Sequence, residues 1–313
     1  MTDPSPPRSG PGAPAQAFQQ AERALLADYR IDAGQRFLAL ADPPLTVRVL
    51  ETGAGEPLVL VHGSGMSAPT WAPMLAHLGD RRVHAVDLPG FGLSDPLDYS
   101  GRTLRGHAVA QLGSLLDALE LEQATIAGTS LGAMWALCLA LERPERVRRV
   151  VAIGIPAVAL PWMKGDPFFR AMTTPVVKGL VSRIPAPRSA KATRRAMTRA
   201  MGRPVAERYS DAFFDVVRTG MGMPGWKRAM ASHLNLAMRS GKARPENLLS
   251  DEELRSIEAP VLFVMGEADV YGPPSVCERA AAVMPHARVE VMPGGHAPFL
   301  DDPARCAELI RSG

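Results

Sequence analysis

The stretch Gly128-Thr129-Ser130-Leu131-Gly132 joins two segments of different character. The apolar, partly β-branched run 124–127 before it predicts a strand, and the helix-forming run 133–140 after it predicts a helix. A serine between two glycines at a sharp strand-to-helix turn is the pattern of a nucleophile elbow, in which the hydroxyl projects above the sheet. An ordinary Gly/Ser turn is the alternative, because so short a pentapeptide recurs by chance. The strand–turn–helix context favours a nucleophilic Ser130.

Apolar runs of strand length recur on both sides of this turn. They predict strands at 36–40, 45–50, 57–61, 83–86, 124–127, 147–153, 260–265 and 288–292. Helical segments separate most of them, at 15–29, 71–78, 103–119, 133–143 and 275–284, with a last helix after Asp302. This alternation predicts an α/β fold with a mostly parallel central sheet covered by helices on both faces. Parallel sheets place ligands and chemistry at the carboxyl ends of their strands.

Between Pro156 and Ser250 the alternation stops. Proline repeatedly interrupts short helical stretches there, and the segment holds eight of the 15 Met residues. It carries 17 Lys and Arg residues against five Asp and Glu, whereas the rest of the chain carries 18 against 27. We therefore predict a helical cap inserted into the α/β core. The predicted division is a disordered tail (1–14), a first core part (15–155), the cap or lid (156–250) and a second core part (251–313).

One helix predicted in this insertion, 188–203, is amphipathic. It would place Arg188, Lys191, Arg195 and Arg199 on one face and Ala190, Met197 and Met201 on the opposite face. A basic amphipathic helix can contact a membrane surface or an anionic ligand. A surface helix with its apolar side on the core is the more common arrangement, and the one favoured here.

Composition argues against several classes of protein. A hydrophobic content of 46% with 21% charged residues is normal for a soluble globular protein, and no apolar run approaches the ~20 residues of a membrane span. Residues 1–14 lack the apolar segment of a signal peptide. Cys138, Cys277 and Cys306 are far apart and predict buried thiols in the cytoplasm. No cluster has metal-ligand spacing, so neither a metal nor a cofactor is expected.

A serine hydroxyl is a weak nucleophile near neutral pH and needs a base that an acid orients. The chain offers one of each after its last two predicted strands: Asp269 in a short turn, then His296 in a Gly-rich loop. Two further polar residues stand at strand ends. His62 is better interpreted as a structural member of a His-Gly turn, and Asp87, which precedes Pro-Gly, as fixing the geometry of its loop.

Four motifs in this order resemble those of cap-bearing α/β-hydrolases, over a stretch from about Leu45 to Ile310. They are His62-Gly63-Ser64-Gly65, Asp87-Leu88-Pro89-Gly90-Phe91-Gly92-Leu93-Ser94, the elbow, and Gly295-His296. The resemblance implies that His296 takes the Ser130 proton and returns it to the leaving group, while Asp269 holds the imidazole tautomer. It also implies an oxyanion hole formed by the backbone N–H groups of Ser64 and Leu131.

A serine at the elbow separates the chain from haloalkane dehalogenases and epoxide hydrolases of this fold, which use an aspartate there. The resemblance therefore implies a serine hydrolase that cleaves a small to medium, largely apolar carboxylic ester or lactone. We expect a substrate pocket that includes Trp71, Trp162, Met223 and Trp226. The expected partner is a small-molecule acyl substrate, with neither nucleic acid nor stable membrane insertion.

Three alternatives stay open at this point. A hydrolase of C–C bonds in ring-cleavage products and an acyltransferase would both use the same triad. A ligand-binding protein that retains the hydrolase fold, and signals by closure of its cap, belongs to a different class. The sequence does not identify the acyl group, the alcohol or the oligomeric state.

Overall fold

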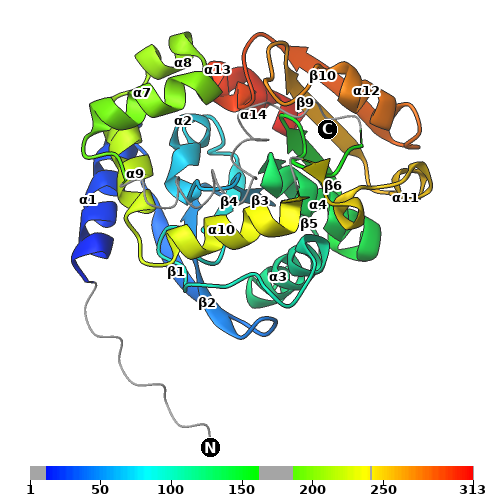
Figure 1. The fold of residues 1–313 in the computed structure, drawn as a ribbon, viewed down its shortest axis with the longest axis horizontal. Helices are drawn as coiled ribbons and strands as arrows, with labels where there is room; N and C mark the ends of the chain where they lie inside the picture. The colour runs from blue at the N-terminus through cyan, green and yellow to red at the C-terminus, as the bar shows by residue number, and fades with distance from the viewer. Residues whose placement is uncertain (1–11, 162–185, 240–241, 313) are drawn as a thin grey trace, which may run out of the picture.

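The computed structural model describes residues 12–161, 186–239 and 242–312. The strands are β1 (Gly34–Leu40), β2 (Leu45–Thr52), β3 (Glu56–Val61), β4 (Arg81–Val86), β5 (Ala124–Thr129), β6 (Val147–Ile153), β7 (Met238–Arg239), β8 (Lys242–Ala243), β9 (Val261–Gly266) and β10 (Ala287–Met292). Strands β7 and β8 pair with each other, and the other eight form the central sheet (Figure 1).

The described helices are α1 (Ala13–Asp28), α2 (Ala72–Leu75), α3 (Leu104–Ala118), α4 (Leu131–Glu142), α7 (Ala190–Met201), α8 (Arg203–Arg208), α9 (Asp211–Met221), α10 (Trp226–Ala237), α11 (Asp251–Arg255), α12 (Ser275–Ala281), α13 (Pro298–Asp301) and α14 (Pro303–Arg311). Three short 3-10 helices accompany them: η1 (Ala68–Trp71), η2 (Pro144–Arg146) and η3 (Pro245–Asn247).

The sheet has the strand order β1-β2-β4-β3-β5-β6-β9-β10. Strand β2 pairs antiparallel with both of its neighbours, and the remaining neighbours pair in parallel. The predicted α/β class with a mostly parallel sheet is therefore confirmed. The elbow follows β5, near the middle of the sheet.

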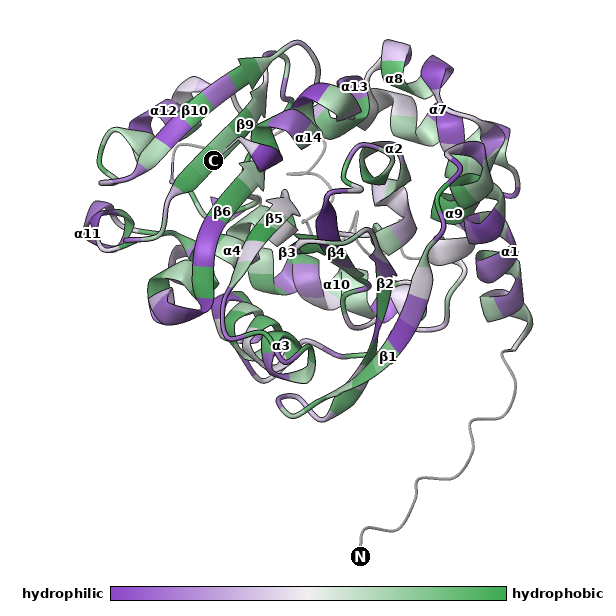
Figure 2. Cartoon of the chain, turned by 180° about the vertical axis from the view of Figure 1, so that it is seen from behind, coloured by the Kyte–Doolittle hydropathy of each residue, from purple (hydrophilic) through white to green (hydrophobic). Residues whose placement is uncertain are grey.

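Helices cover both faces of the sheet because its inner strands are apolar on both sides. Side chains alternate between the faces along a strand. Val59 and Val61 of β3 therefore join one hydrophobic cluster with α3, α4 and α12, while Leu58 and Leu60 join another with α1, α2 and α14. Figure 2 shows the same continuous apolar character in β9. Helix α4 is buried from Leu131 to Ala140, as expected for the helix that follows the central strand.

Two predictions near the N-terminus are corrected. The helix predicted at 71–78 is the 3-10 helix η1 followed by the single turn α2, which ends at Leu75. Pro73 has no N–H group to continue the hydrogen-bond ladder from the preceding turn, which explains the break. Helix α1 begins at Ala13, so the last residues of the predicted tail are helical, with Pro14 in the first turn where a helix tolerates it. Residues 1–11 of that tail lie outside the described residues.

The segment predicted as a cap contributes α7 to α10 and the hairpin β7–β8, inserted between β6 and β9. Helix α7 has the predicted amphipathic character, with its basic face outward and its apolar face inward. The exposed residues are Arg188, Lys191 and Arg195, and the inward ones are Ala190 and Met197, whereas the side chains of Arg199 and Met201 lie outside the described part. This arrangement agrees with a surface helix that packs on the core.

All three cysteines are free thiols in the protein interior, as predicted. Burial raises the pKa of Cys138 and of Cys306 to about 12, so neither ionises near neutral pH. Among the described helices, none combines the length and the hydropathy that crossing a membrane requires.

Candidate active site

Ser130 stands at the apex of the turn between β5 and α4. Its φ of 52° is positive, a conformation that a residue with a side chain adopts only under constraint. The glycines on either side permit this turn. A Cβ on Gly128 would lie 2.2 Å from the carbonyl carbon of Gly132, and a Cβ on Gly132 would lie 2.1 Å from the carbonyl oxygen of Val61. The strained strand–turn–helix geometry that an elbow requires is therefore present.

A carboxylate and an imidazole from later strand ends form a hydrogen-bonded pair. His296 Nδ1 lies 2.8 Å from Asp269 Oδ2. An ionised carboxylate only accepts hydrogen bonds, so Nδ1 carries the proton and Nε2 is left with a free lone pair. The Asp269 side chain is completely buried and also accepts from the backbone N–H groups of Ile155 at 3.0 Å and Tyr271 at 2.9 Å. These three donors fix both carboxylate oxygens.

The backbone and side chains around His296 hold its ring in one orientation. Gly154, directly after β6, has a φ of +67°, and a Cβ there would lie 2.2 Å from the carbonyl oxygen of His296. The Tyr271 ring meets the imidazole in a T-shaped contact, with 4.2 Å between ring centroids. Asp301 accepts a hydrogen bond of 3.1 Å from the Gly295 N–H in the same loop. A general base requires this kind of fixed orientation.

A cavity of about 250 Å³ lies between the strand ends and the inserted helices. Ser130 and His296 both line it, so the predicted nucleophile and base face one space. Its apolar lining includes Met66, Ile155, Val158, Met197, Phe213, Met230, Leu234, Ala237, Met238, Phe299 and Leu300. Within the described chain, neither Asp, Glu, Lys nor Arg is part of this lining.

Three of the four residues predicted to supply this pocket, Trp71, Met223 and Trp226, are absent from its described lining. Trp71 is completely buried in the core and contacts the ring of Phe299, with 4.3 Å between centroids. Met223 packs on the hydrophobic cluster around α1 and α9. Trp162 lies outside the described residues. Met and aromatic content predicts burial, but it does not distinguish core packing from the lining of a cavity.

The loop after β3, residues 62–68, packs against the elbow; we call it the β3 loop. A Cβ on its Gly63 would lie 3.4 Å from Ser130 Cβ. Both predicted oxyanion-hole residues, Ser64 in this loop and Leu131 at the start of α4, line the cavity. The first N–H groups of a helix have no acceptor within the helix, which suits Leu131 to that role. Trp226 holds the loop from the insertion, since its Nε1 donates to the Gly65 carbonyl at 3.0 Å.

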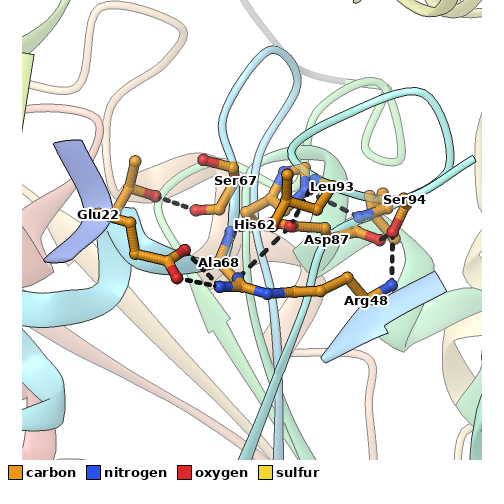
Figure 3. A network of polar contacts seen from close by, with 10 residues as sticks. Glu22, Arg48, His62, Ser67, Ala68, Asp87, Leu93 and Ser94 are labelled. Atoms are coloured by element: carbon orange, nitrogen blue, oxygen red, sulfur yellow. Dashed lines mark hydrogen bonds and ion pairs between the residues drawn. The ribbon is translucent and has the colours of Figure 1, made fainter. Parts of the chain in front are cut away.

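A buried polar network holds the β3 loop from the core side (Figure 3). Asp87 Oδ1 accepts from the Ala68 N–H at 2.7 Å, and Oδ2 accepts from the Leu93 N–H at 2.9 Å. Arg48 Nη1 lies 3.4 Å from the same Oδ2. Asp87 is completely buried, and its contacts join its own loop to the end of the β3 loop. This agrees with the prediction that it fixes loop geometry.

His62 anchors the start of the same loop. Its Nε2 accepts a hydrogen bond from the Leu88 N–H at 3.0 Å, so Nδ1 carries the proton and donates to the Gly63 carbonyl at 2.8 Å. Burial lowers the pKa of His62, which keeps the ring neutral. The predicted structural role of this histidine agrees with these contacts.

Sequence reasoning missed three residues of the site. Tyr271 positions Asp269 through its N–H and His296 through its ring. Glu22 and Arg48 extend the network around Asp87, and Glu22 contacts Arg48 Nη2. One signal was available for Glu22, because it stands in the middle of the apolar stripe of α1. The described residues contain no group of three or more His, Cys, Asp and Glu side chains suited to a metal ion.

His233, in the lining of the cavity, should make the protein less stable in acid. Burial lowers its pKa from 6.5 to about 3, and neither ring nitrogen has a hydrogen-bond partner among the described residues. Below pH 6.5 the unfolded chain therefore binds a proton at His233 that the folded protein does not bind. The free energy of unfolding is highest above pH 6.5 and decreases as the pH is lowered. We expect the free energy of unfolding to be about 2 kcal/mol lower at pH 5 than at pH 8 from this group alone.

Urea unfolding at both pH values measures this loss, with His233→Leu as the matched variant. The variant has no group to protonate at this position, so its stability should change correspondingly less between pH 8 and pH 5. An equal change in both proteins would contradict the assignment of the acid sensitivity to His233.

A model of the alpha/beta hydrolase family matches residues 58–309 of the chain. The match covers most of the sequence and agrees with the fold described above, so the chain belongs to the alpha/beta hydrolase family. The resemblance to this family inferred from the motifs is thereby confirmed. The match begins within β3 and leaves out α1, β1 and β2.

Curated relatives and solved structures of similar fold are hydrolases. The chain is 44% identical over 124 residues to the 2-hydroxymuconate semialdehyde hydrolase of Pseudomonas sp. (strain CF600), a match that covers 37% of this chain and only 42% of that protein. It is 29% identical over 274 residues to the 2-hydroxy-6-oxononadienedioate/2-hydroxy-6-oxononatrienedioate hydrolase of Cupriavidus pinatubonensis, covering 82% of this chain and 86% of that one. The crystal structure of carboxylesterase CesB from Bacillus subtilis has a TM-score of 0.75 at 23% identity and covers 96% and 98% of the two chains, which shows the fold.

Proposed function

We propose that this protein is a serine hydrolase that cleaves a small to medium, uncharged, largely apolar carboxylic ester or lactone. The observation that carries the proposal is the cavity: Ser130 and His296 face it, Asp269 is hydrogen-bonded to His296, and its described lining carries no charged side chain of Asp, Glu, Lys or Arg. Burial of an unpaired substrate charge in such a space is costly, so an uncharged acyl group fits it better.

The reaction proceeds through an acyl-enzyme. Ser130 Oγ attacks the ester carbonyl while His296 Nε2 takes its proton, and the oxyanion of the tetrahedral intermediate accepts from the N–H groups of Ser64 and Leu131. His296 returns the proton to the alkoxide as the C–O bond breaks. Water then attacks the acyl-enzyme with His296 as base, and collapse of the second intermediate releases the acid and the free serine. Asp269 stabilises the imidazolium in both halves.

Hydrolysis of a C–C bond next to a carbonyl is the second candidate, and the relatives from Pseudomonas sp. and Cupriavidus pinatubonensis support it. Their names specify a semialdehyde and a dioate as substrates. A dioate carries two carboxylates, and the described lining of the cavity offers neither Lys nor Arg to pair with them. The ester is therefore the first choice.

A matched pair of substrates tests the proposal. Mono-p-nitrophenyl succinate differs from p-nitrophenyl butyrate by a carboxylate in place of the terminal methyl group. We expect kcat/KM to be about 100-fold higher for the butyrate, because the described lining of the cavity offers the succinate carboxylate neither Lys nor Arg as a partner. Higher activity on the succinate, or on a 2-hydroxy-6-oxo-dienoate than on any ester, would contradict the proposal. If an alcohol is added and its ester with the acyl group appears among the products, the protein transfers the acyl group to the alcohol.

A further inference from the structure

The β3 loop is tied to the N-terminal helix by a chain of buried charges. We propose that Glu22 of α1 is a positioning residue for the hydrolytic reaction, because through Arg48 and Asp87 it fixes the loop that carries the Ser64 N–H. This inference rests on the proposed function, in which that N–H group donates to the oxyanion. It makes α1, outside the part of the chain that matches the family, a component of the active site.

The first link is between α1 and β2. Glu22 is surrounded on the inner face of α1 by Phe18, Ala21, Leu25 and Leu26, and only 7% of its surface is exposed. Both carboxylate oxygens contact Arg48 Nη2. A carboxylate in an apolar stripe costs stability unless a cation pairs with it. The position of Glu22 is therefore explained by its partner, not by packing.

The second link is Arg48 itself, which is completely buried in β2. Its guanidinium lies between two carboxylates, with Nη2 on Glu22 and Nη1 at 3.4 Å from Asp87 (Figure 3). The backbone of Arg48 is fixed as well, since its N–H donates to Ser94 Oγ at 2.8 Å and its carbonyl accepts from the Asp87 N–H at 2.9 Å. Ser94 Oγ in turn donates to the Asp87 carbonyl. Arg48 thus contacts Asp87 through its guanidinium and through its backbone carbonyl.

The third link is from Asp87 to the β3 loop. Asp87 Oδ1 accepts from Ala68 at the end of this loop, and His62 fixes its start, so Ser64 lies between two anchors. The stronger contact of Arg48 is with Glu22, and the contact with Asp87 is the longer one. Because Arg48 pairs mainly with Glu22, the Asp87 oxygens stay available to accept hydrogen bonds from the backbone N–H groups of Ala68 and Leu93.

Loss of the Glu22 charge should change how Arg48 is shared between Glu22 and Asp87. The Arg48 charge would then have Asp87 as its one carboxylate partner in the described network, and the guanidinium would move toward it. Arg48 would compete with the Leu93 N–H for Oδ2, and the shift of the carboxylate toward the guanidinium would draw Oδ1 away from the Ala68 N–H. The β3 loop would then lose part of its anchor. Stabilisation of an oxyanion depends on donors at a fixed distance, and the loss of one donor costs about 10²–10³ in rate. Partial misplacement should cost less than this.

Helix α1 also contacts the insertion. It packs against α9, and the two helices lie side by side in both views (Figures 1 and 2). Ser210, before α9, donates to Asp28 at the end of α1 at 2.6 Å. The β3 loop is therefore held from the core through Asp87, Arg48 and Glu22, and from the insertion through Trp226. Helix α1 contacts both the core and the insertion.

The test is Glu22→Gln, which keeps the size of the side chain and one acceptor oxygen but removes the charge. With p-nitrophenyl butyrate we expect kcat to fall about 10-fold while KM stays within about twofold, because the oxyanion forms only in the transition state. Inhibition by n-butylboronic acid, which forms a tetrahedral adduct with a nucleophilic serine, should weaken by the same factor as kcat. Glu22→Asp, which keeps the charge, should recover most of kcat.

Glu253→Gln is the matched control. It breaks the ion pair with Arg105, whose Nη1 lies 2.6 Å from Glu253 Oε1, and a Gln at this position still completes the capping box of α11. Its partners lie outside the β3 loop, so its kcat should equal that of the wild type.

The outcomes separate the two proposals. A Glu22→Gln protein with lower thermal stability but wild-type kcat and boronic acid affinity would overturn the inference and leave Glu22 as a structural residue. A wild-type protein that neither hydrolyses esters nor binds the boronic acid would instead overturn the proposed function. If Glu22→Gln does not fold, the same measurements on Arg48→Lys decide, because Lys keeps the charge but cannot contact both carboxylates in the same way.

Discussion

Replacement of Ser130 or of His296 by Ala should lower kcat/KM for p-nitrophenyl butyrate by about 10⁴–10⁶, and the double variant should be no less active than either single one. Without Ser130 there is no atom to form the acyl-enzyme. Without His296 the hydroxyl keeps its proton and remains a weak nucleophile. Because neither residue supports the reaction without the other, the effects of the two substitutions on kcat/KM are not additive. Steady-state kinetics on the three purified variants measures this.

Ser64→Ala is the control for this prediction. Ser64 lines the same cavity, and in the proposed mechanism it donates through its backbone N–H, which the substitution retains. We expect this variant to keep activity within about tenfold of the wild type. A Ser130→Ala protein with comparable activity to Ser64→Ala would exclude Ser130 as the nucleophile.

Asp269→Asn should fold normally and lose about 10³–10⁴ in kcat. The carboxylate now accepts from His296 Nδ1 at 2.8 Å and from two backbone N–H groups. An Asn with its oxygen in place of Oδ1 retains the contact with the Tyr271 N–H, but its NH₂ group then replaces Oδ2, where it cannot accept from the Ile155 N–H or from His296 Nδ1. An amide NH₂ facing the imidazole would favour the tautomer with its proton on Nε2. That tautomer cannot take the proton of Ser130. Circular dichroism checks the fold and steady-state kinetics checks the loss.

Asp302→Asn provides the comparison for this second variant. Asp302 caps α14 by accepting from the Arg305 N–H at 3.0 Å, and Asn is an equally good N-cap residue. Its activity should be unchanged. A fully active Asp269→Asn enzyme would mean that another acid orients the base.

The fold was predictable from the sequence because both of its signals are local. A continuous apolar run such as 57–61 indicates a strand buried on both faces, and its alternation with helical segments indicates a parallel sheet. The elbow is recognisable in the sequence because its turn requires residues without a side chain at positions 128 and 132, where a Cβ would collide with nearby backbone atoms. The order of Ser130, Asp269 and His296 along the chain then follows the order of the strands.

The pocket and the network were not predictable in the same way. Trp71 and Phe213 are both aromatic residues buried in the same hydrophobic cluster, yet only Phe213 belongs to the described lining of the cavity. Only the packing of distant segments decides between them. Glu22 and Arg48 belong to different elements, 26 positions apart, and their pairing depends on where α1 lies against β2. A buried charge within an apolar stripe indicates that a partner exists, but the sequence does not identify it.

The central claim is that Ser130 is an activated nucleophile, and its reaction with a fluorophosphonate probe tests this most directly. Mass spectrometry of the labelled native protein should place one adduct on Ser130. We expect no labelling of Ser130→Ala, and much slower labelling of His296→Ala because its hydroxyl is no longer activated. Absence of labelling in the folded wild-type protein, or an adduct on another residue, would contradict the claim and favour a ligand-binding protein on a hydrolase fold.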